Sequence, residues 1–588
     1  MKKILLITIT NPLMGGRWLP VGAGVIMSYC LKNEEFNNKF KFHPTEFRQD
    51  CLDITEFHNI LKDTDIIGFT CYIWNQDVND KIAQQFKQYR KDGIVIYGGP
   101  NVPENFDDAN EFAQQKQFVD IFFIGPGEKN FLNYLIYNSK EGTYSTNHYN
   151  ISTNRSSYQV TREETPTPFQ DGIFDEILKR EKNIGIPLET TRGCPYSCAF
   201  CDWGSQSNSK IVKFDEEVLK KEIKYFTNFD SVRYIDFCDA NYGIFERDVD
   251  IIKFICENKN QILSVSFSGF AKNGTDRISE IHDLLSENFS MFLNEIKISL
   301  QTMSNQTLAT IKRSNIKTKK LISIVTKKRN NQLISGELII GLPGETANSW
   351  LDTLCKTAEI GIDSLKVHRL LVLPNTLLND KEYIKNNNII FKDIKIPTFV
   401  LNGGKTNKGA IVAVLKNYPN PEDLKVESGN YAPFEKFKTI ISCNSFDFNE
   451  FLKMHEKQFW YNALIGNSFL IDHMKNLNID LRIQSDMFFD NLNNMPFFKS
   501  LKDSYINNIK RVLIDDKDGV TYNYLEYFSV MMNKNMEAHK IYKNLNTAIS
   551  EIKQIYPTAT FDHIRNFNND ELLRLASVYG TLKKKIKQ

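Results

Sequence analysis

Three cysteines stand close together in the first half of the chain, spaced C-x3-C-x2-C. They are Cys194, Cys198 and Cys201, and they follow a short apolar run at residues 184–188. Three thiolates can hold three irons of a 4Fe–4S cluster, whereas a purely structural cluster uses four cysteines. The fourth iron is then open to another ligand, in the way that a catalytic metal site keeps one position open. The motif therefore predicts a cluster with a free coordination position.

A zinc knuckle is the alternative use of such closely spaced cysteines. Zinc in a structural site takes four ligands, so a fourth ligand should lie nearby. No His and no further Cys occurs between residues 202 and 237. The sequence therefore favours the iron–sulfur cluster over zinc.

Composition narrows the class of protein. A chain of 588 residues with 41% hydrophobic and 24% charged residues is typical of a globular protein with two to four domains. A net charge of +2 gives no basis for a nucleic-acid partner, and no apolar run is long enough to predict a membrane span. The other seven of the ten cysteines are scattered singly, which indicates a reducing cytoplasm rather than a disulfide framework.

Residues 1–140 alternate strand-like apolar runs with segments of helical spacing. Such runs, buried on both faces and separated by helices, predict a doubly wound parallel sheet. Ligands of these sheets bind at the carboxyl ends of the strands. The expected strands are residues 4–9, 39–43, 65–71, 94–97 and 119–124.

A second strand–helix alternation follows a connector at residues 141–183. Six strand candidates between residues 184 and 378 predict a partial β/α barrel, and barrel active sites lie at the carboxyl ends of the strands. The cysteines come directly after the first of these strands. Residues 379–588 are expected to form a mostly helical domain. The six candidates are residues 185–189, 231–237, 263–267, 295–300, 337–340 and 364–371.

The cysteine spacing, with an aromatic residue before the third cysteine, resembles that of the radical S-adenosylmethionine (SAM) enzymes. The resemblance implies that the open iron chelates SAM and that an electron from the cluster cleaves it. The turn at residues 239–243, the strand end at 299–301 and the strand at 337–340 resemble SAM-binding segments of that family. The resemblance implies that SAM is contacted by seven residues: Phe200, Asp239, Asn241, Ser299, Gln301, Arg313 and Ile339.

Several segments of residues 1–140 look like the cobalamin-binding domain that precedes many radical SAM barrels. The D-x-H-x-x-G motif, whose His binds cobalt in other cobalamin proteins, is absent. The resemblance thus implies a cobalamin without a protein His ligand, and it leaves open a degenerate domain that has lost the cofactor. The implied cobalamin contacts are Pro20, Tyr72, Trp74, Gly98, Gly99, Gly125, Gly127 and Glu128.

Taken together, these resemblances imply a cobalamin-dependent radical SAM methyltransferase. It would methylate an unactivated carbon of a natural product or peptide, through a 5′-deoxyadenosyl radical and methylcobalamin, with electrons from a flavodoxin or ferredoxin. One alternative is a radical SAM enzyme that epimerises, rearranges or joins carbons without methyl transfer. Cys238 could then donate a hydrogen atom, although a buried Cys is commonly a small core residue. Another alternative is a non-catalytic iron–sulfur or cobalamin-binding sensor. His368 is either a general base or a structural residue.

Overall fold

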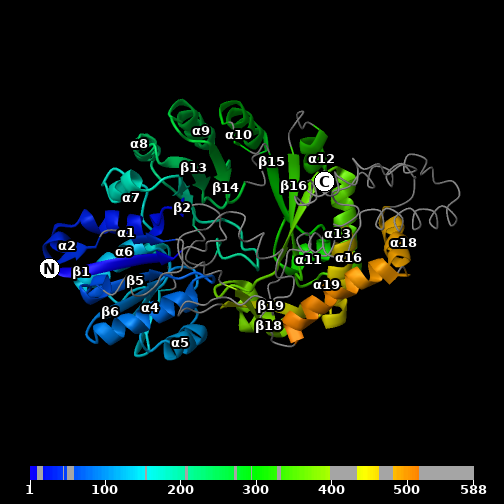
Figure 1. Cartoon of the computed structure of the whole chain (residues 1–588), viewed down its shortest axis with the longest axis horizontal. Coiled ribbons are helices and arrows are strands. Elements are labelled where there is room, and N and C mark those ends of the chain that lie inside the picture. Colours follow the sequence, from blue (N-terminus) through cyan, green and yellow to red (C-terminus); the bar gives the residue numbers. More distant parts are fainter. Residues whose placement is uncertain are drawn as a thin grey trace, which may run out of the picture.

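A computed structural model describes most of the first four hundred residues and part of the remainder. The described residues are 1–9, 17–43, 46–48, 59–152, 155–204, 210–270, 275–289, 291–292, 295–326, 333–397, 434–461, 481–494 and 496–514. Figure 1 shows an N-terminal α/β unit, coloured blue, beside a second unit of green strands and helices. Among the helices that these residues form, none is both long and apolar enough to cross a membrane.

The N-terminal unit is built on an eight-stranded sheet. Its strands run in the order β3-β1-β5-β6-β7-β8-β9, and β4 also pairs with β1. All pairs from β3 to β7 are parallel, as predicted, while β8 and β9 add an antiparallel edge. The strands are β1 (Lys2–Ile9), β3 (Phe40–Phe42), β4 (Glu46–Arg48), β5 (Ile66–Thr70), β6 (Ile94–Gly98), β7 (Ile121–Phe123), β8 (Thr143–Ser145) and β9 (His148–Asn150).

Helices cover both faces of this sheet (Figure 1). Successive residues of a strand point to opposite faces, so Leu5 and Ile7 of β1 pack in one core while Ile4 and Leu6 pack in the other. The first core includes residues of α4 and α5, and the second includes residues of α1 and α6. The helices are α1 (Val21–Leu31), α2 (Glu34–Lys39), α4 (Gln76–Tyr89), α5 (Phe106–Gln115) and α6 (Gly127–Tyr137).

The N-terminal sheet extends ten residues past the expected boundary at residue 140. Strands β8 and β9 lie in the segment expected to be a connector, where the buried Tyr144 stacks on Phe122 of β7 at 4.8 Å. Their sequences, TYS and HYN, are polar and form no apolar run of the kind that marks a buried strand. The rest of the segment carries η2 (Arg155–Tyr158) and α7 (Asp175–Arg180).

The two units are interleaved at one strand. Residues Arg17–Trp18 form β2, which pairs with the first barrel strand rather than with the N-terminal sheet. Gly185 leaves room for this pairing, because a Cβ there would lie 2.5 Å from the Trp18 ring. The start of α1 is thereby anchored on the barrel.

The second unit contains the six parallel strands that the sequence predicts for a partial barrel. They form two ladders, β10-β13-β14 and β15-β16-β17, and β2 adds a fourth strand beside β10. The strands are β10 (Ile184–Leu188), β13 (Val232–Phe237), β14 (Ser264–Phe267), β15 (Glu295–Gln301), β16 (Leu333–Ile340) and β17 (Ser364–Arg369). The helices around them are α8 (Glu216–Phe226), α9 (Arg247–Glu257), α10 (Thr275–Asn288), α11 (Asn305–Thr310), α12 (Thr318–Thr326) and α13 (Ala347–Ile360).

The C-terminal region shares a hydrophobic core with the second half of the barrel. Trp350 of α13 and Trp460 of α16 are both fully buried in one cluster, which also contains Ala199 from the cysteine loop. The boundary expected at residue 378 therefore does not separate two cores. The elements here are η4 (Leu377–Asn379), α14 (Lys381–Asn386), the antiparallel pair β18 (Ile390–Pro397) and β19 (Phe434–Ser442), α16 (Phe448–Trp460), α18 (Leu481–Asn494) and α19 (Pro496–Ile514). Much of the expected helical domain, residues 462–480 and 515–588, lies outside the described residues.

Candidate active site

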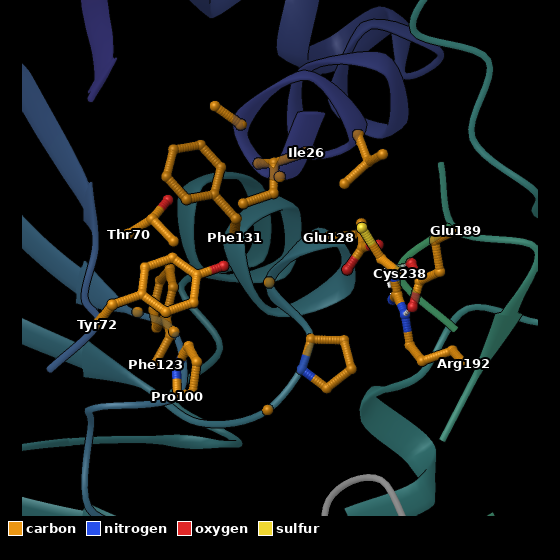
Figure 2. A pocket seen from close by; sticks show the side chains of 18 of the residues that line it. Ile26, Thr70, Tyr72, Pro100, Phe123, Glu128, Phe131, Glu189, Arg192 and Cys238 are labelled. Carbon is orange, nitrogen blue, oxygen red and sulfur yellow. Dashed lines mark hydrogen bonds and ion pairs between the residues drawn. The ribbon is translucent and has the colours of Figure 1, made fainter. Parts of the chain in front are cut away.

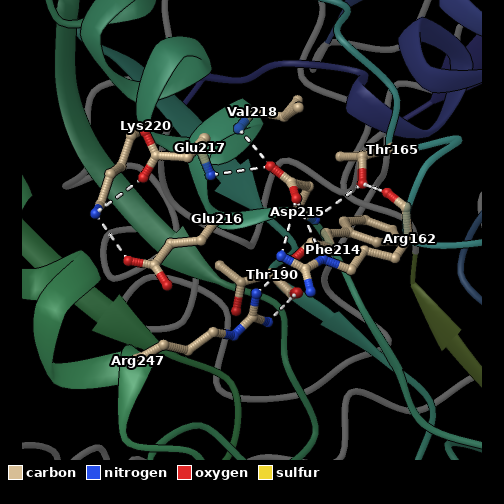
Figure 3. A network of polar contacts seen from close by, with 10 residues as sticks. All are labelled: Arg162, Thr165, Thr190, Phe214, Asp215, Glu216, Glu217, Val218, Lys220 and Arg247. Carbon is tan, nitrogen blue, oxygen red and sulfur yellow. Dashed lines mark hydrogen bonds and ion pairs between the residues drawn. The ribbon is translucent and has the colours of Figure 1, made fainter.

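The cysteines lie on a loop that a short hairpin closes at its base. Strands β11 (Thr191–Arg192) and β12 (Val212–Lys213) pair antiparallel on either side of the loop. Arg247, at the start of α9, joins the two sides: it donates to the carbonyl of Thr190 at 2.7 Å and to the carbonyl of Phe214 (Figure 3). Asp215 caps α8 on the same side and accepts from Arg162 at 3.0 Å. These bonds fix the loop at the carboxyl end of β10.

The three cysteines border one pocket of about 150 Å³, which we call the cluster pocket. Cys194 and Cys198 are buried, and Cys201 is partly exposed. The pKa of the Cys201 thiol is raised to about 11, mainly by burial and to a smaller extent by the neighbouring Cys198 and Cys194. No three His, Cys, Asp or Glu side chains in the described residues are grouped as a site for a single metal ion. Three cysteines around one pocket suit a cluster, in which each thiolate binds a different iron.

Five of the seven residues assigned to SAM line the cluster pocket beside the cysteines. They are Phe200, Asn241, Ser299, Gln301 and Arg313. The other two, Asp239 and Ile339, do not line it. Asp239 is buried and accepts from the backbone N–H and the hydroxyl of Thr190, at 3.1 and 2.8 Å. Ile339 packs against the core of the second half of the barrel.

Gln301 is the residue of this pocket with an unused acceptor. Its backbone φ is +66°, at a register shift at the end of β15. Its side-chain oxygen Oε1 is buried and has no hydrogen-bond partner among the described residues. A buried acceptor without a partner costs free energy, so a ligand that donates to it would be stabilised there. SAM, which carries ammonium and hydroxyl donors, fits this position.

A second pocket, of about 310 Å³, lies between the N-terminal sheet and the cysteine loop, and we call it the sheet pocket. Figure 2 shows Tyr72, Thr70 and Phe123 along one side and Glu128, Glu189, Arg192 and Cys238 along the other. Six of the eight residues assigned to cobalamin line it: Tyr72, Gly98, Gly99, Gly125, Gly127 and Glu128. Pro20, before α1, and Trp74, which stacks on Tyr72 at 4.4 Å, do not.

Glycines leave the sheet pocket wide at two places. A Cβ added to Gly22 of α1 would meet no atom within 4 Å, and one added to Gly98 would meet only Phe123, at 3.8 Å. Both glycines line the pocket, so their missing side chains contribute to its space. A flat, largely apolar ring system such as a corrin fits a wall of this kind. Gly22 belongs to the segment at residues 19–22 that resembles a cobalamin-binding domain, but it was not among the assigned contacts.

A buried ion-pair bridge forms part of the pocket wall, and sequence reasoning missed its central residue. Arg192 Nη1 lies 2.8 Å from Glu128 of α6, and Arg192 Nη2 lies 2.7 Å from Glu189. Burial alone would lower the pKa of Arg192, but Glu128 and Glu189 together raise it well above its ordinary value. The bridge therefore joins the N-terminal unit to the strand that leads into the cysteine loop.

The two pockets meet at Trp203 and Ala240, which line both. Molecules bound in the two pockets would thus face each other across these residues. Cys238 lines the sheet pocket and not the cluster pocket, and burial raises the pKa of its thiol well above the ordinary value. His368 lies beside Ile339 in the β16–β17 ladder, is exposed, and lines neither pocket.

Comparisons with known proteins agree with this geometry. Residues 188–355 match the family model of the radical SAM superfamily. The chain is 28% identical over 439 residues to the cobalamin-dependent radical SAM methyltransferase TokK of Streptomyces tokunonensis, covering 71% of this chain and 63% of that protein. It is 30% identical over 387 residues to a 2-(S-pantetheinyl)-carbapenam-3-carboxylate methyltransferase of Streptantibioticus cattleyicolor, covering 62% and 55%. The chain thus spans less than two thirds of the length of either relative.

Among solved structures, the fold is similar to that of OxsB, a cobalamin-dependent S-adenosylmethionine radical enzyme. The TM-score to its apo form is 0.50 at 17% identity, covering 99% of this chain and 84% of that one. At this identity the likeness concerns the fold alone. Residues 188–355 of this chain thus match the radical SAM superfamily, and the chain is similar to a cobalamin-dependent radical SAM methyltransferase and to a carbapenam methyltransferase.

Proposed function

We propose that this chain is a cobalamin-dependent radical SAM methyltransferase. The observation that supports it most is the meeting of the two pockets at Trp203 and Ala240. One pocket holds three cysteines with space for a fourth ligand, and the other is a glycine-lined crevice at the carboxyl ends of parallel strands. When bound, the cluster and SAM supply a radical that abstracts hydrogen, and cobalamin supplies a methyl group.

The chain's own residues bind and orient these groups. Cys194, Cys198 and Cys201 would hold the cluster, and Gln301 and Ser299 would contact SAM at the end of β15. Gly22, Gly98 and Gly125 would border the corrin together with Tyr72, and Trp203 would lie between the two pockets. Of the described His residues, none lines the sheet pocket, so the proposal includes a cobalamin without a His ligand.

The substrate would lie where the pockets meet. One relative is named for a carbapenam carboxylate, a small molecule, and we propose a small natural product or a peptide for this chain. C-methylation of an unactivated carbon follows from the pairing of a hydrogen-abstracting radical with a methyl donor. An electron donor such as flavodoxin or ferredoxin would reduce the cluster.

Anaerobic reconstitution of the full chain tests this function. Wild-type protein should take up about four irons per chain, which is the content of one 4Fe–4S cluster. It should also bind added cobalamin and form 5′-deoxyadenosine from SAM with a strong reductant. With its substrate it should also release S-adenosylhomocysteine. Formation of 5′-deoxyadenosine without cobalamin uptake would exclude the methyl-transfer function, and failure to cleave SAM would favour a sensor.

Two variants separate the pockets in this experiment. Cys198→Ala should lose the cluster and SAM cleavage while still binding cobalamin. Gly22→Leu should place a side chain in the sheet pocket and lose cobalamin while retaining the cluster, because α1 remains helical with Leu at this position. Cobalamin binding that is unchanged in Gly22→Leu would contradict the assignment of the sheet pocket.

A further inference from the structure

Two side chains donate hydrogen bonds to cysteine sulfurs of the cluster pocket. The amide nitrogen Nδ2 of Asn241 donates to Cys194 Sγ at 3.2 Å. The guanidinium of Arg313 donates from Nη1 to Cys198 Sγ at 3.6 Å. Both donors come from outside the cysteine loop, since Asn241 follows β13 and Arg313 follows α11.

Other contacts hold each donor in place. Arg313 uses Nη2 to donate to the carbonyl of Ser299 and Nε to donate to Asn315 Oδ1 at 3.1 Å. The turn that carries Asn241 is fixed at its next two residues: the N–H of Tyr242 donates to Gly269, and the N–H of Gly243 donates to the buried Asp248 at 2.8 Å. The two donors therefore face the sulfurs because the barrel positions them there.

Hydrogen bonds to sulfur change the energy of cluster reduction. The electron that enters an iron–sulfur cluster adds negative charge, which is shared by its sulfurs. A donor, and above all a cationic donor, stabilises this added charge and makes the reduction potential less negative. An amide and a guanidinium on two different thiolates would both act in this direction.

We propose that Asn241 and Arg313 set the reduction potential of the cluster through these two hydrogen bonds. They are then positioning residues that tune the cluster. Their part in SAM cleavage is to make the reduction potential of the cluster less negative, so that its electron donor can reduce it. The inference rests on the proposed function, because it requires the cluster. It differs from the assignment of both residues to SAM in one respect: it predicts an effect in protein that contains no SAM.

The test is an EPR-monitored redox titration of the reconstituted full chain without SAM. Asn241→Asp keeps the side-chain size, removes the donor and adds negative charge, so its midpoint potential should be more negative than that of wild type. Arg313→Gln should shift the potential in the same direction, because it removes a cation. Asn258→Asp is the matched control, since Asn258 caps the end of α9 through a bond to the Phe254 carbonyl, and it should keep the wild-type potential.

Iron and sulfide content are measured before each titration. If Asn241→Asp does not retain a cluster, Asn241→Ser is titrated in its place, because it shortens the side chain without adding charge. Its midpoint potential should also be more negative than that of wild type. A wild-type potential in the Asn241 variant overturns the proposal. If SAM binding is weakened while the potential is unchanged, Asn241 is a SAM contact and does not tune the cluster. A wild-type chain that forms no cluster would instead refute the proposed function.

Discussion

At the scale of single residues, Gln301 gives the sharpest test of the SAM site. Gln301→Leu removes the buried acceptor that has no partner among the described residues. We expect SAM affinity to fall about fivefold, since one hydrogen bond is worth about 1 kcal/mol. The SAM-free protein should keep or gain stability, because the orphaned acceptor is gone. If Gln301 had a structural role instead, Gln301→Leu would lower the stability of the SAM-free protein.

Calorimetry of SAM binding to the cluster-loaded protein measures the first effect, and thermal unfolding measures the second. Gln306→Leu is the control, as Gln306 is an exposed residue of the neighbouring helix α11. It should leave SAM affinity unchanged. Equal affinities of wild type and Gln301→Leu would remove Gln301 from the SAM site.

Asp239 makes stability depend on pH. Burial raises its pKa from 3.8 to about 7, although the hydrogen bonds from Thr190 act in the opposite direction. The folded state therefore binds this proton more tightly than the unfolded chain does, and the stabilisation is fully present below pH 4. It is lost as the pH rises from about 4 to about 7, by up to about 4 kcal/mol.

Asn at position 239 can accept from the Thr190 N–H and donate to its hydroxyl without titrating. The unfolding free energy of wild type should thus fall relative to that of Asp239→Asn between pH 4 and 7. Urea denaturation at several pH values measures this difference. A constant difference across that range would mean that Asp239 stays ionised in the folded protein.

The sequence predicts residues of the cluster pocket better than it predicts what they contact. Cysteine spacing is local, and the three cysteines that it singles out do border one pocket. Asn241 and Arg313 were assigned to SAM, yet in the structure both donate to cysteine sulfurs. Asp239 was assigned with them, but successive residues of a turn point in different directions, and Asp239 points to Thr190. Such directions depend on backbone angles that a motif does not specify.

At the scale of elements, Arg192 joins α6 to the strand before the cysteine loop. Arg192→Met would leave the carboxylates of Glu128 and Glu189 without their cation, and Glu128 is almost fully buried. We expect a loss of about 3–5 kcal/mol in the free energy of unfolding, which is the usual cost of breaking a buried ion pair. Glu128→Gln added to Arg192→Met should recover part of this loss.

Arg162→Met is the matched control, because it breaks an ion pair with Asp215 in which Arg162 is 62% exposed. It should cost below about 1 kcal/mol. Urea denaturation near pH 7 measures all of these variants. The bridge would be judged unimportant if Arg192→Met cost no more than Arg162→Met.

Strands were predictable where apolar residues form a run. The five N-terminal strands and the six barrel strands were found from apolar runs, and each overlaps an observed strand. β8 and β9 were missed because their sequences, TYS and HYN, are polar and form no apolar run, unlike the equally short β7, IFF. β2 was missed because its two residues pair with a strand far along the chain. Pairing over such distances depends on how the two units pack, which local sequence does not encode.

At the scale of the whole molecule, one hydrophobic core connects the C-terminal helices to the cysteine loop. Ala199, between Cys198 and the phenylalanine before Cys201, lies in the same buried cluster as Trp350 and Trp460. The backbone N–H of Ala199 donates to the carbonyl of Ile311, and its carbonyl accepts from Leu378, next to the expected boundary of the last domain. The loop that would hold the cluster therefore rests on both sides of that boundary.

Trp460→Ala tests whether this shared core behaves as one unit. Removing a fully buried Trp should cost about 3–5 kcal/mol, and heat should then release the cluster at a lower temperature than in wild type. Visible absorbance of the cluster and far-ultraviolet circular dichroism should report that loss together. Phe86→Ala, in the core on the α4 and α5 face of the N-terminal sheet, should destabilise the protein by a similar amount. Because that core does not include Ala199, it should lower the temperature of cluster release less. Equal effects of the two variants on cluster release would show that the protein unfolds as a single cooperative unit, in which the shared core has no special connection to the cysteine loop.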